Sequence, residues 1–144
     1  MKIAITGAGG QLGGELCRQL VESAVALTRP ALDITDRRCV LDVLGSIRPD
    51  AVINAAAYTA VDQAESEREL CRAVNAEGVA HIVEACRRLD CPLVQISTDY
   101  VFGRDADRRV PYHETDAPGP LNVYGTRVTW TYDDTYQLKT EDRS

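Results

Sequence analysis

The sequence is poor in the residues that build metal centres and in the cysteine patterns that build disulfide frameworks. It has only two histidines, His81 and His113, and its five cysteines are odd in number and form no C-x-x-C pair. Cysteines at apolar helical positions are typical of reduced, buried thiols. We therefore expect neither a metal site nor a disulfide, and we interpret both histidines as structural or surface residues.

The sequence also lacks a long apolar run, a cluster of like charges and an internal repeat. No apolar run approaches the roughly 18–20 residues of a membrane span. We expect no signal peptide, because Lys2 is followed at once by a short apolar strand. The acids are spread along a chain of net charge −6, which argues against a nucleic-acid or anionic-membrane surface. We expect a cytoplasmic protein, and 144 residues allow one domain with a sizeable core.

A glycine-rich turn follows the first apolar run. Gly7, Gly10 and Gly13 have the spacing G-x-x-G-x-x-G, which is offset by one residue from the commoner G-x-G-x-x-G. Between a strand and a helix, such glycines allow a tight turn, a close approach of the backbone to phosphates and close packing of helix on strand. The start of the helix also favours an anion. Glycine turns arise for local reasons too, but this one predicts a dinucleotide site.

Further short apolar runs alternate with helical patterns along the chain. We expect strands at 23–28, 51–54 and 92–97. We expect a first helix through about residue 22, with a buried stripe made of Leu12, Leu16, Leu20 and Val21. A second helix is capped by Thr35 or Asp36, and a long third helix is opened by a capping box at 66–69. Asn75 interrupts the long helix with a polar group that needs a partner if buried. The pattern predicts an α/β fold with a Rossmann-type doubly wound parallel sheet, truncated after about four strands.

The end of the second expected strand bears on the choice of dinucleotide. Thr28 and Arg29 stand where such folds meet the adenosine ribose, and a guanidinium there suits a 2′-phosphate. We therefore expect NADPH in preference to NADH, although an arginine at a strand end is often only a solvated charge. Asp33 and Ile34 would fall beside the adenine, or else form a capped loop.

Three later segments leave the same rim of the expected sheet. Ala55, Ala56 and Ala57 follow the third strand, where small side chains either let a cofactor lie close to the backbone or pack a helix tightly. Ser97 and Thr98 follow the fourth strand, and Tyr124 comes after a long polar loop at 104–120. A phenol that protonates a carbonyl oxygen, and a hydroxyl that holds it, are what carbonyl reduction beside a nicotinamide requires.

Five ordered motifs carry a family resemblance that extends to about residue 125. They lie at residues 3–13, 54–62, 74–78, 97–102 and 120–125. Together they resemble the dTDP-4-dehydrorhamnose reductases, which are extended short-chain dehydrogenase/reductases. The resemblance implies reduction of the 4-keto group of dTDP-4-dehydro-L-rhamnose by NADPH or NADH, the last step of dTDP-L-rhamnose synthesis.

The resemblance also implies roles for individual residues. It places Thr98 on the substrate carbonyl and makes Tyr124 the proton donor. It places a set of residues around the dinucleotide: Gly10, Gln11, Leu12, Asp33, Ile34, Ala55, Ala56, Ala57 and Tyr58. It further implies a dTDP-sugar substrate, a homodimer, and Mg²⁺ at a dimer contact through Glu15.

The sequence departs from the family after Gly125. The family continues as Tyr-x-x-x-Lys, whereas the fourth residue after Tyr124 is Val128, and Lys2 and Lys139 are the only lysines in the chain. We interpret residues 1–125 as an incomplete NAD(P)-binding Rossmann domain and 126–144 as a divergent, poorly ordered tail, without a substrate domain. A frameshift, a natural short form and a fragment with a foreign end are the three explanations that we consider.

These departures leave the function open between classes. Without the lysine and a substrate domain, we expect very low reductase activity. One alternative is a non-catalytic nucleotide-binding or regulatory subunit, because the β subunit of methionine adenosyltransferase resembles the same family and acts through protein contact. Another is a sugar-nucleotide epimerase, which shares the glycine loop but is less similar at 97–102.

Overall fold

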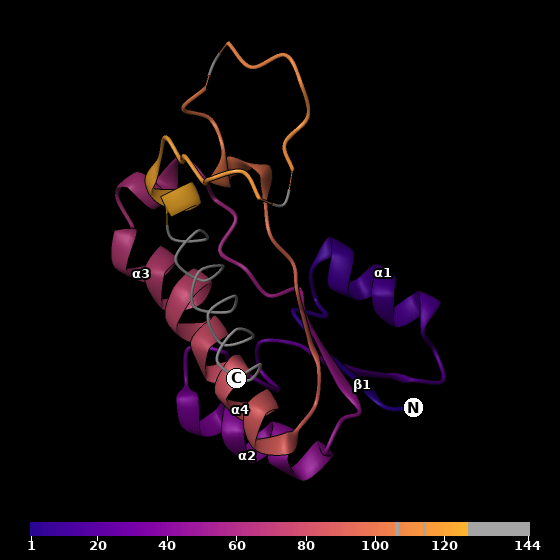
Figure 1. Ribbon diagram of the computed structural model, residues 1–144. Coiled ribbons are helices and arrows are strands. Elements are labelled where there is room, and N and C mark those ends of the chain that lie inside the picture. The colour runs from indigo at the N-terminus through magenta and orange to yellow at the C-terminus, as the bar shows by residue number, and fades with distance from the viewer. Residues whose placement is uncertain (106, 114, 127–144) are drawn as a thin grey trace, which may run out of the picture.

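The computed structural model describes residues 1–105, 107–113 and 115–126, and these form a parallel α/β fold (Figure 1). Its strands are β1 (Ile3–Thr6), β2 (Ala24–Leu27), β3 (Ala51–Asn54) and β4 (Leu93–Gln95). All pairs are parallel, and the strand order is β2-β1-β3-β4. The predicted fold class is confirmed. The predicted tail lies outside the described residues except for Thr126, whose N–H closes a helical turn on the carbonyl of Asn122.

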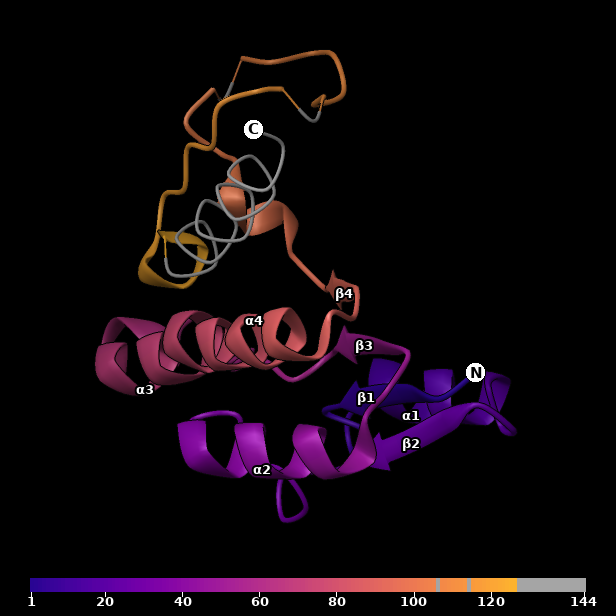
Figure 2. The same cartoon turned by 60° about the horizontal axis from the view of Figure 1, so that its bottom comes forward.

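The connections place helices on both faces of the sheet. The chain crosses from β1 to β2 in one direction and from β2 to β3 in the other, and right-handed crossovers then lie on opposite faces. Helix α1 (Gln11–Gln19) packs on β1 and β2, whereas α2 (Arg37–Ile47) packs against α4 (Gly78–Leu89) on the other side of the strands (Figure 2). Because β1 lies beside β3, the loops that leave these two strands meet at the point where the winding reverses.

The main core lies between the sheet and the α2–α4 layer. It includes residues that are fully buried or nearly so: Ala4, Leu27, Leu32, Ile34, Val40, Leu44, Val52, Ile82, Ala85 and Cys86. At about 25 cal/mol per Å² of apolar surface, each large side chain among them stabilises the fold by roughly 1.5–3 kcal/mol. The α2–α4 layer therefore holds the sheet and leaves the carboxyl ends of its strands free for a site.

The two earliest helices test the predicted boundaries. Helix α1 ends at Gln19, and the predicted buried stripe is wrong at its ends, because Leu12 is 45% and Val21 74% exposed. The closest contact of α1 is instead made by the buried Gly13, which lets the helix approach the glycine turn. The cap of α2 is confirmed, since the Asp36 side chain accepts hydrogen bonds from the backbone N–H groups of Arg38 and Cys39 at 2.9 and 3.1 Å.

The predicted long helix exists, but its predicted start is wrong. A 3₁₀ turn, η1 (Gln63–Glu65), comes first, and α3 (Arg68–Arg72), the π-turn η2 (Ala73–Glu77) and α4 then follow without a break. The predicted capping box at 66–69 is absent: the Ser66 hydroxyl donates to the Gln63 carbonyl at 3.0 Å, and no described side chain caps α3. The spacing of Ser66 and Glu69 does not register the preceding 3₁₀ turn, which takes the Ser66 hydroxyl instead.

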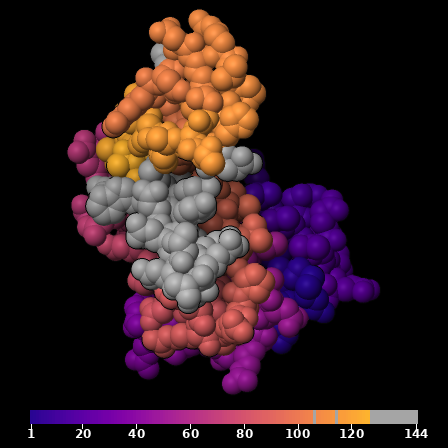
Figure 3. All heavy atoms as spheres, viewed as in Figure 1, coloured from indigo at the N-terminus to yellow at the C-terminus, as the bar shows by residue number. Residues whose placement is uncertain are grey.

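The segment from Gly103 to Pro120 contains neither helix nor strand among its described residues, as the polar composition predicted. Figure 3 shows it as the orange end of the molecule. Arg108 organises it: its Nη2 donates to Asp116 Oδ2 at 2.5 Å and to the Pro111 carbonyl at 2.8 Å, and its guanidinium lies 4.3 Å from the centre of the Tyr112 ring. Tyr112 in turn stacks on Phe102 with ring centres 4.0 Å apart. Hydrogen bonds and ring contacts therefore hold the loop together.

Candidate functional site

The glycine turn after β1 builds one wall of the site. Gly7 has φ 67°, which favours glycine, and a Cβ there would lie 2.6 Å from the carbonyl carbon of Ala55. The chain that leaves β3 therefore packs directly on the turn. Helix α1 begins after Gly10, which has no side chain to cap its first N–H groups. These N–H groups and the open backbone around them make a cradle that suits a pyrophosphate.

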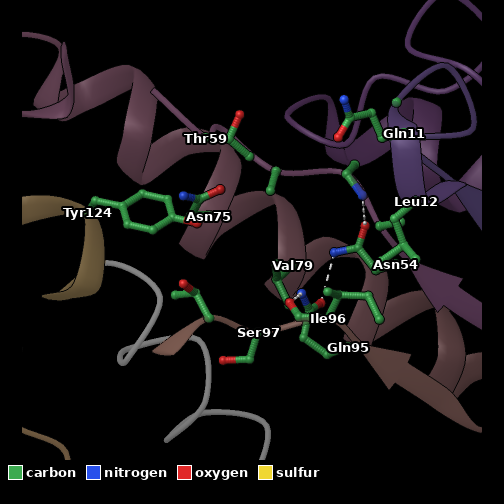
Figure 4. A pocket seen from close by; sticks show the side chains of 15 residues that line it. Gln11, Leu12, Asn54, Thr59, Asn75, Val79, Gln95, Ile96, Ser97 and Tyr124 are labelled. Carbon is green, nitrogen blue, oxygen red and sulfur yellow. Dashed lines mark hydrogen bonds between the residues drawn. The ribbon is translucent and has the colours of Figure 1, made fainter. Parts of the chain in front are cut away.

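A cleft of about 470 Å³ opens beside this turn (Figure 4). Its lining comes from the ends of β1, β3 and β4 and from the helical segments beyond: Gly10, Gln11, Leu12, Asn54, Ala55, Ala56, Ala57, Thr59, Asn75, Val79, Gln95, Ile96, Ser97, Thr98 and Tyr124. The volume falls within the range of small-molecule sites. The cleft therefore brings both predicted catalytic residues, Thr98 and Tyr124, together with part of the predicted dinucleotide set.

A second cleft of about 250 Å³ continues from the first. It is lined by Gly7, Gly10, Arg29, Leu32, Asp33, Ile34, Ala55, Ala56, Ala57, Tyr58, Leu70 and Val74. The two clefts share Gly10 and the three alanines and so meet along the chain that leaves β3. Gly13 is the one predicted site residue in neither lining, because it is buried behind the turn, where a Cβ would lie 2.3 Å from the Gly7 carbonyl oxygen.

The phenol and the hydroxyls are held on the far side of the first cleft from the glycine turn. Tyr124 is only 8% exposed, and Figure 4 shows its hydroxyl pointing into the cleft toward Asn75. Its ring meets the Tyr100 ring edge-on, with centres 5.5 Å apart. Thr98 Oγ1 donates to Asp99 Oδ1 at 3.3 Å and accepts from the Tyr100 N–H at 3.4 Å. Ser97 also faces this cleft, as the sequence predicted.

A chain of polar side chains, buried at Thr6 and Asn54 and half-buried at Gln95, crosses the strands at the first cleft. The Thr6 hydroxyl donates to Asn54 Oδ1, Asn54 Nδ2 donates to Gln95 Oε1 at 2.8 Å, and Gln95 Nε2 donates to the Ile96 carbonyl at 2.7 Å. Thr6, Asn54 and Gln95 are partners in the strand register. Neither Asn54 nor Gln95 was predicted to belong to the site. Each is an amide in an otherwise apolar strand, and this isolated polar residue could have indicated a role.

Asn75 and Glu67 hold Tyr58 in the second cleft. The Asn75 side chain accepts from the Tyr58 N–H at 2.8 Å and donates to the Tyr58 carbonyl at 2.9 Å, which supplies the partner that the sequence required. The Tyr58 hydroxyl donates to Glu67 Oε2 at 2.8 Å. Desolvation, followed by the hydrogen bond and the charge of Glu67, raises the pKa of Tyr58 to about 12. Tyr58 is therefore a neutral donor at physiological pH.

The end of the second cleft at Arg29 and Asp33 carries a base and an acid. Asp33 accepts hydrogen bonds from Thr35 Oγ1 at 2.7 Å, the Thr35 N–H at 3.0 Å and Arg29 Nε at 3.3 Å. The bonds from Thr35, more than the Arg29 guanidinium, hold the pKa of the Asp33 carboxyl below its ordinary value. Asp33 thus both caps its own loop through Thr35 and lines the second cleft, so the two interpretations of this residue do not exclude each other. His81 Nδ1 lies 2.9 Å from the Ile34 carbonyl and fixes the loop from below.

The described residues offer little to a metal ion. Within them, no group of three or more histidine, cysteine or acidic side chains is arranged to bind one. Glu15, which the resemblance linked to Mg²⁺, instead pairs with Arg18 and accepts from Gln19 Nε2 at 2.7 Å. Across the same described ranges, no helix has both the length and the apolar character needed to cross a bilayer.

Comparisons with known proteins identify the family of the chain. The family model described as the RmlD substrate binding domain matches residues 1–130. A dTDP-4-dehydrorhamnose reductase from Streptomyces griseus is 48% identical over 124 residues, which make up 84% of this chain and 40% of the relative. The chain thus spans about two-fifths of that relative's length.

Solved structures show the same fold. A dTDP-4-dehydrorhamnose reductase from Bacillus anthracis str. Ames in complex with NADP is 40% identical, has a TM-score of 0.89, and is matched over 96% of this chain and 50% of its own. UDP-glucose 4-epimerase from Thermotoga maritima shares the fold alone. It is 21% identical and has a TM-score of 0.87, and the match covers 98% of this chain and 52% of the epimerase. Because the family model matches most of its length, this chain belongs to the RmlD substrate-binding-domain family.

Proposed function

We propose that this protein binds NADPH in the two joined clefts and serves the reduction of the 4-keto group of dTDP-4-dehydro-L-rhamnose. The observation that carries the proposal is the first cleft, where Thr98 and Tyr124 face the glycine turn across the alanine run. The named activity of the 48% identical relative supports the same reaction. The bound NADP of the 40% identical structure supports the cofactor.

The residues of the site fit such a dinucleotide. The backbone N–H groups at the start of α1, after Gly10, would hold the pyrophosphate, and the small side chains of Ala55–Ala57 leave room for the rings to lie against the chain. When bound, NADPH supplies the hydride that reaches the carbonyl carbon. Tyr124 then donates the phenolic proton to the carbonyl oxygen, and the Thr98 hydroxyl donates a hydrogen bond to the same oxygen as negative charge develops.

The balance of charges on the adenosine side favours NADPH over NADH. Asp33 would accept from a free ribose 2′-hydroxyl, but three donors already occupy its carboxylate. The Arg29 side chain is 75% exposed and uses only Nε in its bond to Asp33. An exposed pair of this kind contributes at most about 1 kcal/mol. The guanidinium is therefore free to turn its remaining N–H groups toward a 2′-phosphate.

Val128 sets a limit on the rate that we propose for this 144-residue chain. The family motif Tyr-x-x-x-Lys has a lysine at this position, whose positive charge would stabilise the Tyr124 phenolate, and the sequence provides valine instead. We expect dinucleotide binding with little turnover. The same residue is the observation that favours the second candidate, a non-catalytic nucleotide-binding subunit of the kind that the sequence left open.

A pair of variants at this position tests the proposal. The purified chain is given NADPH and dTDP-4-dehydro-L-rhamnose, and the loss of NADPH is followed for the wild type, Val128→Lys and Val128→Met. We expect turnover to rise about tenfold or more with lysine and to stay unchanged with methionine, which has similar bulk but no charge. Binding without turnover in all three proteins would favour the non-catalytic subunit. Robust turnover of the wild type would contradict the proposed impairment, and absence of NADPH binding would overturn the whole proposal.

A further inference from the structure

The acids at the start of the long helical segment make distant contacts on both sides of the site. Glu65 Oε1 accepts a hydrogen bond from the Val123 N–H at 2.8 Å, across 58 positions of sequence. Glu67 Oε2 accepts from the Tyr58 hydroxyl at 2.8 Å. Val123 directly precedes Tyr124 in the first cleft, whereas Tyr58 lines the second. The segment from Gln63 to Glu67 therefore reaches both clefts.

Glu65 contributes a polar anchor from η1 to the turn at 123–126, which also has local hydrogen bonds to Asn122. The turn at 123–126 lies against η1 and the start of α3 (Figure 1). Ala64 and Cys71, both fully buried, form a small cluster with Tyr124. Glu65 is itself oriented by Arg68, whose Nη2 lies 3.4 Å from its Oε2 and whose Nε donates to its carbonyl at 3.0 Å. A hydrogen bond to a carboxylate is roughly twice as strong as a neutral one. Glu65 therefore helps to fix the position of this turn, and of Tyr124 within it, beside the first cleft.

Glu67 completes the constraints on Tyr58. Asn75 fixes the main chain of Tyr58 through two hydrogen bonds, and the side chain packs against the cluster that includes Ala64 and Cys71. The bond from the Tyr58 hydroxyl to Glu67 adds a directional constraint on the ring. The ring is then held as a wall of the second cleft, opposite the segment that carries Asp33 and Ile34.

We propose that Glu65 and Glu67 are positioning residues for the two halves of one site: Glu65 sets the place of the Tyr124 phenol, and Glu67 sets the place of the Tyr58 ring beside the dinucleotide. The assignment of the clefts to reductant and carbonyl rests on the proposed function, whereas the two contacts do not. Each acid acts on a different phenol. The two effects can therefore be separated experimentally.

The Glu65 contact is tested in the full chain carrying ¹³C-labelled tyrosine rings. Tyr124→Phe assigns the Tyr124 signal, whose position depends on the edge-on contact with the Tyr100 ring. We expect Glu65→Ala to move this signal toward the value of an unstructured tyrosine. Glu65→Gln should restore it, because the amide oxygen still accepts from the Val123 N–H. Glu69→Ala removes an exposed acid of α3 and should leave it unchanged.

The Glu67 contact is tested on the same samples and by titration with NADPH. We expect Glu67→Ala to move the Tyr58 signal and weaken NADPH binding about three- to tenfold, the range for one side chain that must be ordered on binding. Glu67→Gln should recover most of both, and neither variant should move the Tyr124 signal. Glu65→Ala should leave NADPH affinity within about twofold of the wild type.

The outcomes distinguish this inference from the proposed function. If the wild type does not bind NADPH, the proposed function fails, and the two tyrosine signals still decide the positioning roles. An unchanged Tyr124 signal in Glu65→Ala, or an unchanged Tyr58 signal in Glu67→Ala, overturns the role of that acid. Equal movement of both signals in every variant would show a general loss of structure and overturn both roles.

Discussion

At the scale of single residues, Tyr58 should make folding stability sensitive to alkaline pH. Its pKa is raised to about 12 in the folded protein, against about 10 in an unfolded chain. The neutral phenol is thus favoured by folding, and its contribution to stability is complete below about pH 10 and lost as the pH rises toward about 12. Urea unfolding at increasing pH should show a steeper loss of stability for the wild type than for Tyr58→Phe. Parallel curves for the two proteins would contradict the prediction, because all other tyrosines titrate in both.

Single residues of the site differ in how far the sequence alone could predict them. Gly7, Thr98 and Tyr124 stand in ordered motifs at strand ends, and a parallel sheet brings such ends to one rim. Asn54 and Gln95 also stand at strand ends, but their roles depend on side-chain partners in neighbouring strands. Glu67 was covered only by the predicted capping box at 66–69 and Glu65 was given no role, because spacing reports only near neighbours. Residues whose partners are distant in sequence are the ones that sequence reasoning missed.

At the scale of the elements, boundaries follow local chemistry where a local signal exists. Strand β3 begins and ends where the apolar run does, and α2 begins after its predicted cap, Asp36. The π-turn η2 has no such signal in the sequence. It arises where Asn75 turns inward to hold the Tyr58 backbone, and insertions of this kind in helices often accompany functional sites.

Two glycines in helices predict opposite effects of the same substitution. A Cβ at Gly13 would lie 2.3 Å from the Gly7 carbonyl oxygen, so Gly13→Ala forces α1 away from the glycine turn and should cost about 1–3 kcal/mol. A Cβ at Gly45 in α2 would meet nothing within 4 Å, so Gly45→Ala should raise the free energy of unfolding by about 0.5–1 kcal/mol. Urea unfolding of both variants provides the comparison. A Gly13→Ala protein as stable as the wild type would show that α1 does not pack as described.

At the scale of the whole molecule, the strand order explains why one site draws on the entire length of the described chain. The reversal of winding between β1 and β3 leaves a crevice at their carboxyl ends. The glycine turn, the alanine run and Thr98 enter it from successive strands, and the turn at 123–126 returns to it from beyond the long loop. Any ligand that bridges both clefts must therefore stabilise β1, β3 and β4 together.

Because the cofactor would contact three strands, a difference in its affinity should appear as a difference in the stability of the whole fold. A ligand that binds only the folded state stabilises it by about 2.7 kcal/mol at a hundred times its dissociation constant. If Arg29 contacts the 2′-phosphate, NADPH should bind about tenfold more tightly than NADH, a difference of about 1.4 kcal/mol. Thermal unfolding at equal, saturating concentrations should then show a midpoint about 3 to 6 °C higher with NADPH.

Arg29→Ala should remove this difference between the two cofactors and leave the stabilisation by NADH in place. Arg38→Ala is the matched control, since Arg38 is also an exposed arginine paired with an acid four residues on, Asp42 in α2, and lines neither cleft. Equal midpoints with NADPH and NADH in the wild type would contradict the assignment of Arg29. In that case Asp33 would recognise the free 2′-hydroxyl of NADH, and Asp33→Asn should weaken the binding of NADH but not that of NADPH, which has no hydroxyl there.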